Sequence, residues 1–219
     1  MTLSILAHEP DTGAIGGAAT TGNLCVGAWV LRGDRRAGMT ASQGTAPSVL
    51  WGEEALAAMK AGASAEEAVG STVKADAGAP ARQLAALDRR GGTGAYDGAD
   101  NHAWCGHLAL PGVIVAGNWL HSAAVVQAAA NGFTATQGPL AEKLLAALRA
   151  GAEAGGDARG LMSAALQVHS PGAAPLDLRV DDSPEPLASL SALYQRTRMP
   201  AYGAWLATVP TLEEPQRCR

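Results

Sequence analysis

The chain has 219 residues, of which 47% are hydrophobic, and its 16 basic and 20 acidic residues give a net charge of -4. This length fits one large domain or two small ones, with enough apolar residues for a hydrophobic core. Without a basic field or a Lys/Arg-rich run, nucleic acid is not an expected partner. With no stretch near ~20 apolar residues and no signal-like start, the sequence favours a cytoplasmic protein that does not enter a membrane.

The first predicted element is a β-hairpin that begins at residue 2. Apolar residues recur over 3–7, EPDTG supplies the turn, and AIGGAATTG continues as a strand of small residues. Two further short strands are predicted over 25–33 and 37–44, joined by the charged turn DRR. A strand starting directly behind Met1 is unusual, because chain termini fray unless a sheet holds them.

Helices follow these strands. The segment 49–62 ends at Gly62, a typical C′ glycine, and Ser64 with Glu67 forms a capping box for the next helix. Pro139 in the first turn and Gly151 at the end mark another helix. The remaining elements, in order, are a hairpin over 82–98, a buried strand over 112–118, helices over 122–133 and 139–151, strands over 161–170 and 175–182, and a helix over 185–196.

Blocks of strands separated by helix pairs favour antiparallel sheets with helices packed outside them, since parallel sheets require strict alternation. We therefore predict an α+β fold: a four-layer αββα sandwich of two antiparallel sheets, with residues 4–7 in a central strand. A single domain is expected over 2–196, followed by a C-terminal extension over 197–219 that is an arm or partly disordered. The Gly/Ala-rich segment 150–160 is expected to be a loop, because it lacks the spacing of a phosphate-binding motif.

This element order, with a threonine at the start of the first strand, resembles the N-terminal nucleophile (Ntn) hydrolases, the superfamily of the proteasome β-subunits. The chain also resembles the bacterial family catalogued as domain of unknown function 1028, over most of residues 2–195. The strings that carry this second resemblance are SILAHEPDTG, GNLCVGA, EEALAAMKAGASAEEAV, RQLAALD, GDARGLMSAAL and DLRVDDSPEPLASL. The Ntn resemblance implies that the first residue of the processed chain is the nucleophile.

Thr2 has the chemistry that this role needs. A threonine hydroxyl attacks once a base takes its proton, and a free α-amine with a pKa near ~8 can be that base on the same residue. Removal of Met1 is expected, because Thr2 is small. The alternative is that Thr2 is a β-compatible residue with no catalytic role.

Position in the Ntn pattern implies two further site residues. Gly44 precedes the first helix pair, where a backbone N–H of the superfamily stabilises the oxyanion, and Gln43 beside it is a candidate polar contact. The alternative for Gly44 is a turn glycine. The proteasome also has a carboxylate and a lysine beside its nucleophile, whereas this chain has Thr20 and Thr21 near the position of the acid and Arg32 nearest that of the lysine. Arg32 can fix charge but cannot shuttle a proton near neutral pH.

Two polar positions complete the candidate substrate-binding set. Asn118 falls at the end of a buried strand, where the resembled family usually has a Gly-Asn pair; it either points into the site or caps the following helix with Ser122. Asp181 and Asp182 end another strand, and such acids bind a substrate amine or serve as caps and solvated charges. Asp181 is kept as a candidate.

Cysteine and histidine patterns point to no further site. Cys25, Cys105 and Cys218 are an odd number at unrelated spacings, which favours free thiols. The stretch NHAWCGH offers zinc-ligand types, with His121 further on, but H-x-x-C-x-H is not an established pattern, so no metal is predicted. A Cys105–His107 nucleophile and base pair is weaker still, because no orienting group is evident.

Two functions follow from these observations. The first is an N-terminal nucleophile hydrolase acting on a small amide or peptide, and the second is a catalytically silent relative that binds a ligand or partner. No cofactor is expected for either. The apolar residues of the tail, Tyr202, Trp205 and Leu206, predict a homo-oligomer, with a dimer as the expected state.

Overall fold

The computed structural model describes residues 2–155 and 160–218; Met1 and residues 156–159 of the expected loop lie outside the described part. The helices and strands, in chain order, are β1 (Thr2–Glu9), β2 (Ala14–Thr21), α1 (Val26–Trp29), β3 (Leu31–Asp34), β4 (Gly38–Gly44), α2 (Val49–Lys60), α3 (Ala65–Lys74), the 3₁₀ turn η1 (Ala79–Ala81), β5 (Arg82–Asp88), β6 (Thr93–Asp97), β7 (Trp104–Leu110), β8 (Val113–Leu120), α4 (Ala124–Ala135), α5 (Leu140–Glu153), β9 (Ser163–His169), β10 (Leu176–Val180), α6 (Pro186–Thr197) and α7 (Pro200–Leu206).

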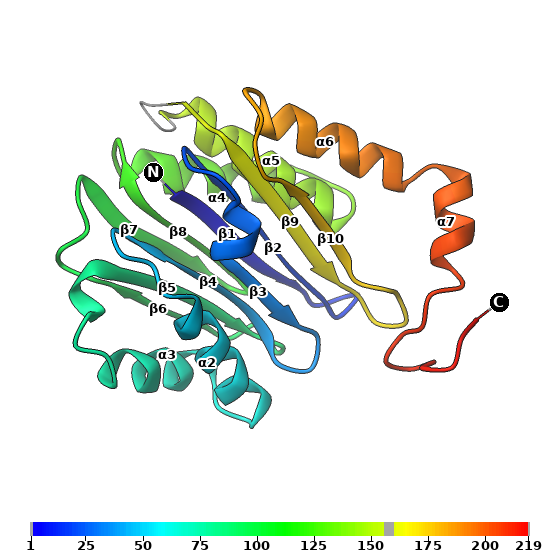
Figure 1. Ribbon diagram of the computed structural model, residues 1–219, viewed down its shortest axis with the longest axis horizontal. Helices are drawn as coiled ribbons and strands as arrows, with labels where there is room; N and C mark the ends of the chain where they lie inside the picture. The colour runs from blue at the N-terminus through cyan, green and yellow to red at the C-terminus, as the bar shows by residue number, and fades with distance from the viewer. Residues whose placement is uncertain (1, 156–159, 219) are drawn as a thin grey trace.

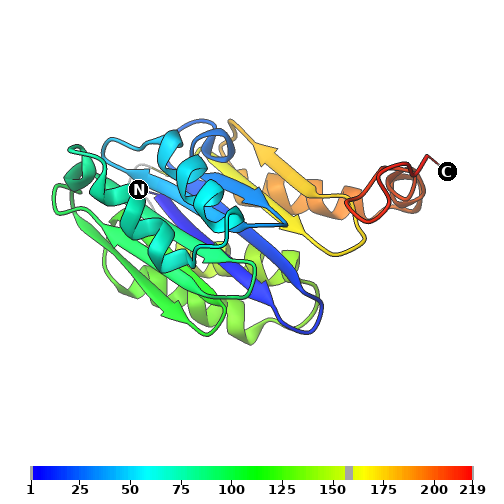
Figure 2. The same cartoon turned by 90° about the horizontal axis from the view of Figure 1, so that it is seen from below.

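The strands form two antiparallel sheets. One has six strands in the order β10-β9-β2-β1-β8-β7, and the other has four in the order β3-β4-β5-β6. Helices α4, α5 and α6 cover the outer face of the six-stranded sheet, and α2 with α3 covers the other (Figures 1 and 2). The predicted αββα sandwich is therefore confirmed, with β1 at the centre of its sheet. Within the described residues, no helix combines the length and apolar character needed to cross a membrane.

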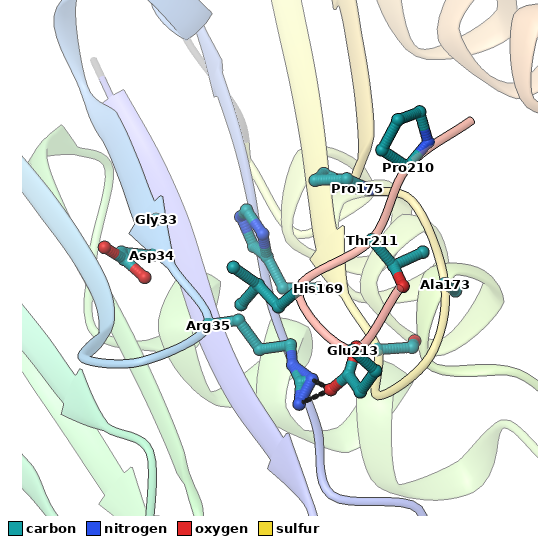
Figure 3. A pocket seen from close by; sticks show the side chains of 11 residues that line it. Gly33, Asp34, Arg35, His169, Ala173, Pro175, Pro210, Thr211 and Glu213 are labelled. Atoms are coloured by element: carbon teal, nitrogen blue, oxygen red, sulfur yellow. Dashed lines mark hydrogen bonds and ion pairs between the residues drawn. The ribbon is translucent and has the colours of Figure 1, made fainter. Parts of the chain in front are cut away.

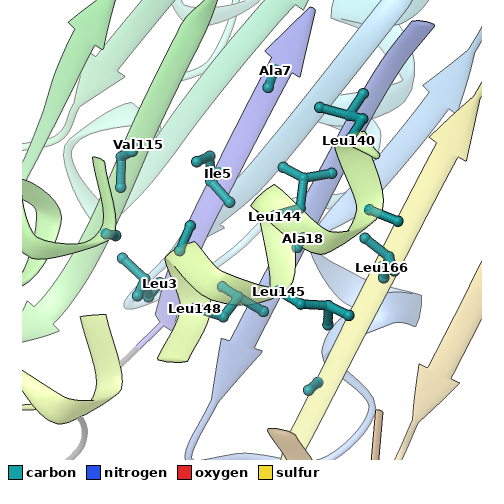
Figure 4. Packing of buried hydrophobic residues seen from close by; sticks show 14 of the residues in the cluster. Leu3, Ile5, Ala7, Ala18, Val115, Leu140, Leu144, Leu145, Leu148 and Leu166 are labelled. Atoms are coloured by element: carbon teal, nitrogen blue, oxygen red, sulfur yellow. The ribbon is translucent and has the colours of Figure 1, made fainter. Parts of the chain in front are cut away.

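Alternation along β1 divides its side chains between two apolar layers. Leu3, Ile5 and Ala7 face α4 and α5 in the largest cluster (Figure 4), whereas Leu6 packs between the two sheets. A third cluster joins the four-stranded sheet to α2 and α3. Because β1 is paired on both sides, with Thr21 and Asn118 opposite Thr2, the start of the chain is held at the junction of the layers.

The largest difference from the predicted elements lies at residues 25–33. Cys25 adopts a left-handed conformation (φ 60°), and the next residues form the short helix α1 before β3 begins. The edge strand β7 has no predicted counterpart. Both helix signals around α2 and α3 are confirmed: Gly62 has a positive φ of 111°, and the Ser64–Glu67 capping box is present.

Helix α5 does not end at Gly151 as predicted but continues to Glu153, into the segment expected to be a loop. Gly151 is a packing position rather than a terminator, because a Cβ there would lie 2.4 Å from Leu3 Cδ2. The glycine lets α5 approach β1 closely and thereby supports the strand that begins at Thr2.

The tail is ordered as a helix and a returning turn. No residue of α7 is buried, and this helix projects from the sandwich beyond α6 (Figure 1). The chain then turns back: Glu213 pairs with Arg35 of the β3–β4 turn and accepts a hydrogen bond of 3.2 Å from Gly172 N in the β9–β10 turn.

Leu144 provides a test of the packing under β1. It is fully buried between α5 and the six-stranded sheet. Leu144→Ala is expected to lower the free energy of unfolding by about 2–5 kcal/mol, because it removes apolar contacts and leaves a cavity. Leu50→Ala, at a position 63% exposed on α2, is the matched control and should change it by no more than about 0.5 kcal/mol. Urea unfolding measures both, and equal losses would contradict the assigned core.

Candidate functional site

The first residue of β1 lies at one end of the sandwich, between the two sheets. Its neighbours in the six-stranded sheet are Thr21 at the end of β2 and Asn118 near the end of β8. The hydroxyls of Thr2 and Thr21 are 3.1 Å apart, so one donates to the other. The half-buried Thr2 thus has its reactive oxygen held by a neighbouring side chain.

Two adjoining cavities open at this end of the molecule. The larger, which we call the α1 cavity, has a volume of about 300 Å³, and the smaller, the Trp119 cavity, about 170 Å³. Thr2, Thr21, Asn23, Gly44 and Thr45 line both. The α1 cavity is completed by Leu24, Val26, Trp29, Val30, Gln43 and Pro47, and the Trp119 cavity by Asn118 and Trp119.

The structure therefore brings together four of the six predicted site residues: Thr2, Gln43, Gly44 and Asn118. They come from β1, from the end of β4 in the opposite sheet, and from β8. Gly44 has a φ of 133°, and a Cβ there would lie 2.7 Å from the Ala81 carbonyl oxygen. The local backbone thus requires glycine at this position, and the same residue faces the cavities that Thr2 lines.

A buried network of amide side chains lies behind the cavities. Gln83 is fully buried, and its Nε2 is 2.6 Å from Asp97 Oδ1, 3.0 Å from the Gly117 carbonyl and 3.1 Å from the Gly106 carbonyl. Because all three neighbours are acceptors, this atom is the amide nitrogen. Gln83 Oε1 then accepts from Gln43 Nε2 at 2.7 Å and from Asn118 Nδ2 at 3.3 Å.

This network leaves one buried polar atom unpaired in Gln43, a residue that lines the α1 cavity. Since Gln43 must direct its NH₂ group toward Gln83, its Oε1 is directed elsewhere, and it has no hydrogen-bond partner among the described residues. Gln43 is 1% exposed. A buried acceptor without a donor is costly unless a ligand or water supplies one. Asn118 points to Gln83 and does not cap α4, whose N-cap Ala123 makes no side-chain cap bond.

Backbone strain gathers near the same cavities. Among the described residues other than glycine, Cys25, Ala103 and Trp119 have positive φ angles of 60°, 54° and 56°. Trp119 lines one cavity, and Cys25 lies between two residues that line the other. Conformations of this kind cost energy and are found most often at functional sites.

Several lining residues were outside the predicted set, among them Asn23, Trp29, Thr45 and Trp119. Trp119 Nε1 donates to Thr45 Oγ1 at 3.4 Å, and the His102 ring packs edge-on against the indole with 5.4 Å between centroids. Trp29 is 55% exposed on α1. Exposed tryptophans often mark binding surfaces. The sequence contains Trp29 and Trp119, but their position in or next to a strand or helix does not indicate that they are exposed.

Arg32 and Asp181 are not part of this group. Arg32 pairs with Thr40 across β3 and β4, on the face where Thr40 Oγ1 donates to the Gly52 carbonyl of α2, and its guanidinium is 3.6 Å from Glu53. The four-stranded sheet thus separates it from Thr2. Asp181 is paired with Arg179 at 2.9 Å on the surface after β10.

The cysteine and histidine of β7 have other partners. His107 Nδ1 is 2.7 Å from Asp97 Oδ2, at the outer end of the amide network. Burial and the nearby Asp97 charge raise the pKa of the Cys105 thiol to about 12, which keeps it protonated near neutral pH and unsuited to attack. In the described part of the chain, no three His, Cys, Asp or Glu side chains gather in a group that could hold a metal ion.

The His107–Asp97 pair gives a pH-dependent prediction. The hydrogen bond and charge of Asp97 raise the pKa of His107 above its ordinary value of 6.5, and burial offsets this in part. The pair should therefore stabilise the fold fully below about pH 6.5 and lose this contribution as pH rises through the raised folded pKa. NMR titration should give a His107 pKa above 6.5, and Asp97→Asn should lower it; an unchanged value in that variant would contradict the assignment.

A cavity of about 390 Å³ lies at the opposite end of the sandwich, where the β3–β4 and β9–β10 turns meet the returning tail (Figure 3). Its charged groups are paired: Arg35 with Glu213, and Asp34 with Arg36 and Lys60. Burial lowers the pKa of His169 there. None of the predicted site residues lines this cavity.

The chain is similar to known proteins both in sequence and in fold. Residues 2–190 match the family model described as "Family of unknown function (DUF1028)". Among solved structures, the crystal structure of protein SPO2555 from Silicibacter pomeroyi, with the same family model, has a TM-score of 0.95 and 45% identity, covering 99% of this chain and 94% of that chain. No curated protein matches. The structural likeness thus includes the tail as well as the sandwich.

Proposed function

The chain belongs to the DUF1028 family of unknown function, and from this premise we propose that it hydrolyses an amide bond in a small amide or peptide, with Thr2 as an N-terminal nucleophile of the Ntn type. The observation that carries the proposal is the position of Thr2: the first strand residue lies at two cavities, opposite Gly44 of the other sheet. Removal of Met1, which lies outside the described residues, is part of the proposal.

The chemistry requires only groups at this end of the sandwich. The α-amine of Thr2 takes the proton from its own hydroxyl, and the oxygen attacks the amide carbonyl to form a tetrahedral intermediate. The backbone N–H of Gly44 donates to the oxyanion. When the intermediate collapses, the C–N bond breaks, the leaving amine takes the proton, and an ester with Thr2 remains. Water then hydrolyses this ester and restores the hydroxyl.

Thr21 and Asn118 are positioning residues in this scheme. The Thr21 hydroxyl, 3.1 Å from the Thr2 hydroxyl, orients the attacking oxygen. Asn118 lies opposite Thr2 in the sheet and is fixed by Gln83. Arg32 and Asp181 are given no part in this scheme, because neither lines the cavities.

A second function is favoured by a specific observation. None of the described residues that line the two cavities carries a charged side chain, so the carboxylate and lysine of the proteasome pattern have no counterpart among them. If the α-amine is not freed, no described group at the site can act as base. The protein would then be a silent relative that binds its ligand without cleaving it.

Reaction with a β-lactone probe tests the hydrolase proposal. Protein whose chain begins at Thr2 should take up one equivalent of probe, and peptide mapping should place it on Thr2. The same protein with an extra residue retained before Thr2 is the matched control and should not react, because its nitrogen is an amide. Failure of the Thr2-initiated protein to react would favour the silent relative.

We further propose a domain over 2–196, an extension over 197–219, a cytoplasmic location and a homodimer in which α7 contributes to the contact. Trp205 and Tyr202 are 57% and 38% exposed on this helix, which buries none of its residues in its own chain. Apolar aromatic surface of this kind is enriched in interfaces. Light scattering at micromolar concentration should give the mass of two chains; a monomer mass would remove the dimer proposal.

A further inference from the structure

Resting on the proposed function, we infer that the ligand of the α1 cavity is an uncharged amide, with an apolar group against Leu24, Trp29 and Pro47 and an N–H that donates to Gln43 Oε1. This inference names the class of substrate that the geometry accepts. It depends on three separate features of the cavity: its charge, its unpaired acceptor and its apolar wall.

The charge of the lining is the first feature. The described residues around both cavities include no Asp, Glu, Lys, Arg or His. The nearest acid of the amide network, Asp97, is already bonded to Gln83 and His107. Once the Thr2 α-amine is neutral, as the proposed base must be, a charged ligand group would lose water without gaining a counter-charge, and burying an unpaired charge is strongly unfavourable. A neutral ligand avoids this cost.

The acceptor is the second feature. Gln43 is 1% exposed, its NH₂ group is committed to Gln83, and its Oε1 has no partner within the described residues. Gln83 cannot turn over to release it, since Asp97 and two backbone carbonyls hold its own NH₂ group. Gln43, which lines the cavity, therefore holds a fixed and buried hydrogen-bond acceptor, and the complement of this atom in a ligand that reaches it is a donor such as an amide N–H.

The third feature is the wall formed by α1 and the loop after β4. Leu24 and Trp29 are 44% and 55% exposed, so large apolar surfaces are left open beside the cavity. Pro47 lines the cavity with them. Apolar walls with few fixed polar groups are typical of small-molecule sites, and a volume of about 300 Å³ suits a small ligand.

Binding of four defined amides and esters tests the inference. Thr2→Ala protein, which cannot turn them over by the proposed route, is titrated by calorimetry or NMR with N-acetyl-leucine methylamide and with the corresponding lysine and glutamate methylamides. The titration is made at about pH 9, where the α-amine is mostly neutral and the lysine and glutamate side chains are still charged. The leucine compound should bind about tenfold or more tightly than either charged one. N-acetyl-leucine methyl ester has an oxygen in place of the methylamide N–H and so lacks this donor. It should bind about fivefold more weakly than the methylamide.

A charge placed on the wall should reverse the preference. Trp29→Glu should make the lysine compound bind more tightly than the leucine compound, whereas Trp205→Glu, at a similarly exposed tryptophan on α7, should leave the order unchanged. Equal affinity for all three methylamides, or no binding of the leucine compound, would overturn the inference. Selective binding of the leucine compound, without hydrolysis of it by the native protein, would reject the proposed hydrolase but not the inference. Hydrolysis of charged and uncharged amides at equal rates would reject the inference but not the hydrolase.

Discussion

Replacing Thr2 by alanine is expected to lower kcat/KM for amide hydrolysis by about 10⁴-fold or more, because the nucleophile is lost while the cavities and the α-amine remain. Alanine is small, so removal of Met1 should proceed as before. The measurement is steady-state hydrolysis of a neutral amide substrate by matched preparations, each checked by mass for the start of the chain.

Two variants make this result specific. Thr2→Ser keeps a hydroxyl on the first residue and should retain measurable activity. Thr21→Val removes the hydroxyl that lies 3.1 Å from the Thr2 hydroxyl and should reduce kcat by about tenfold while leaving KM nearly unchanged, since it only orients the nucleophile. Full activity in Thr2→Ala would contradict the role of Thr2.

Gln83→Leu is expected to have the largest effect on stability among single polar substitutions at this end of the sandwich. Gln83 is fully buried and joins Gln43 and Asn118 to Asp97 and two backbone carbonyls. Leucine has a similar volume but leaves these groups unpaired, and each buried orphan costs about 1–3 kcal/mol. The free energy of unfolding should therefore fall by about 3 kcal/mol or more.

Gln167→Leu is the matched control for this loss. Gln167 lies half-buried on β9, makes one bond of 3.1 Å to Asp177 and already has an unpaired Oε1, so its replacement should cost less than about 1 kcal/mol. Urea unfolding compares the two, with the slope checked for two-state behaviour. A loss in Gln83→Leu no larger than that in the control would mean that the amide network does not stabilise the fold.

Much of the fold could be predicted from the sequence because its signals are local. Alternation over residues 3–7, the Ser64–Glu67 capping box and Gly62 each have a direct physical meaning, and each element occurs where it was expected. The strand β7 was missed because it lies at an edge and buries little of its length, so its apolar residues do not form a clear pattern.

The candidate site was only partly predictable, because it depends on which face of a strand each side chain occupies. Gln43 and Arg32 were both placed near Thr2 from their order in the chain. A strand sends successive side chains to opposite faces, and the pairing of Arg32 with Thr40 directs Arg32 to the α2 side, whereas Gln43 faces Gln83 between the sheets. The left-handed Cys25, at which α1 begins in place of the predicted strand, likewise has no distinct sequence signal.

The hydrogen-bond network could not be predicted from spacing. Gln83 is 40 residues from Gln43 in the sequence, and Asn118 is 35 residues from Gln83. Only the register of three strands in two sheets brings these amides into contact, and a glutamine in a strand gives no indication of burial. The same register leaves Gln43 Oε1 buried and unpaired.

The intact mass of the protein, purified without a tag from the organism that makes it, tests the central claim most directly. We predict a chain that begins at Thr2, because a free α-amine on this residue is the base that the mechanism requires. A native protein that still carries Met1 would contradict the account, since Thr2 would then have an amide nitrogen and no described group at the cavities could accept its proton.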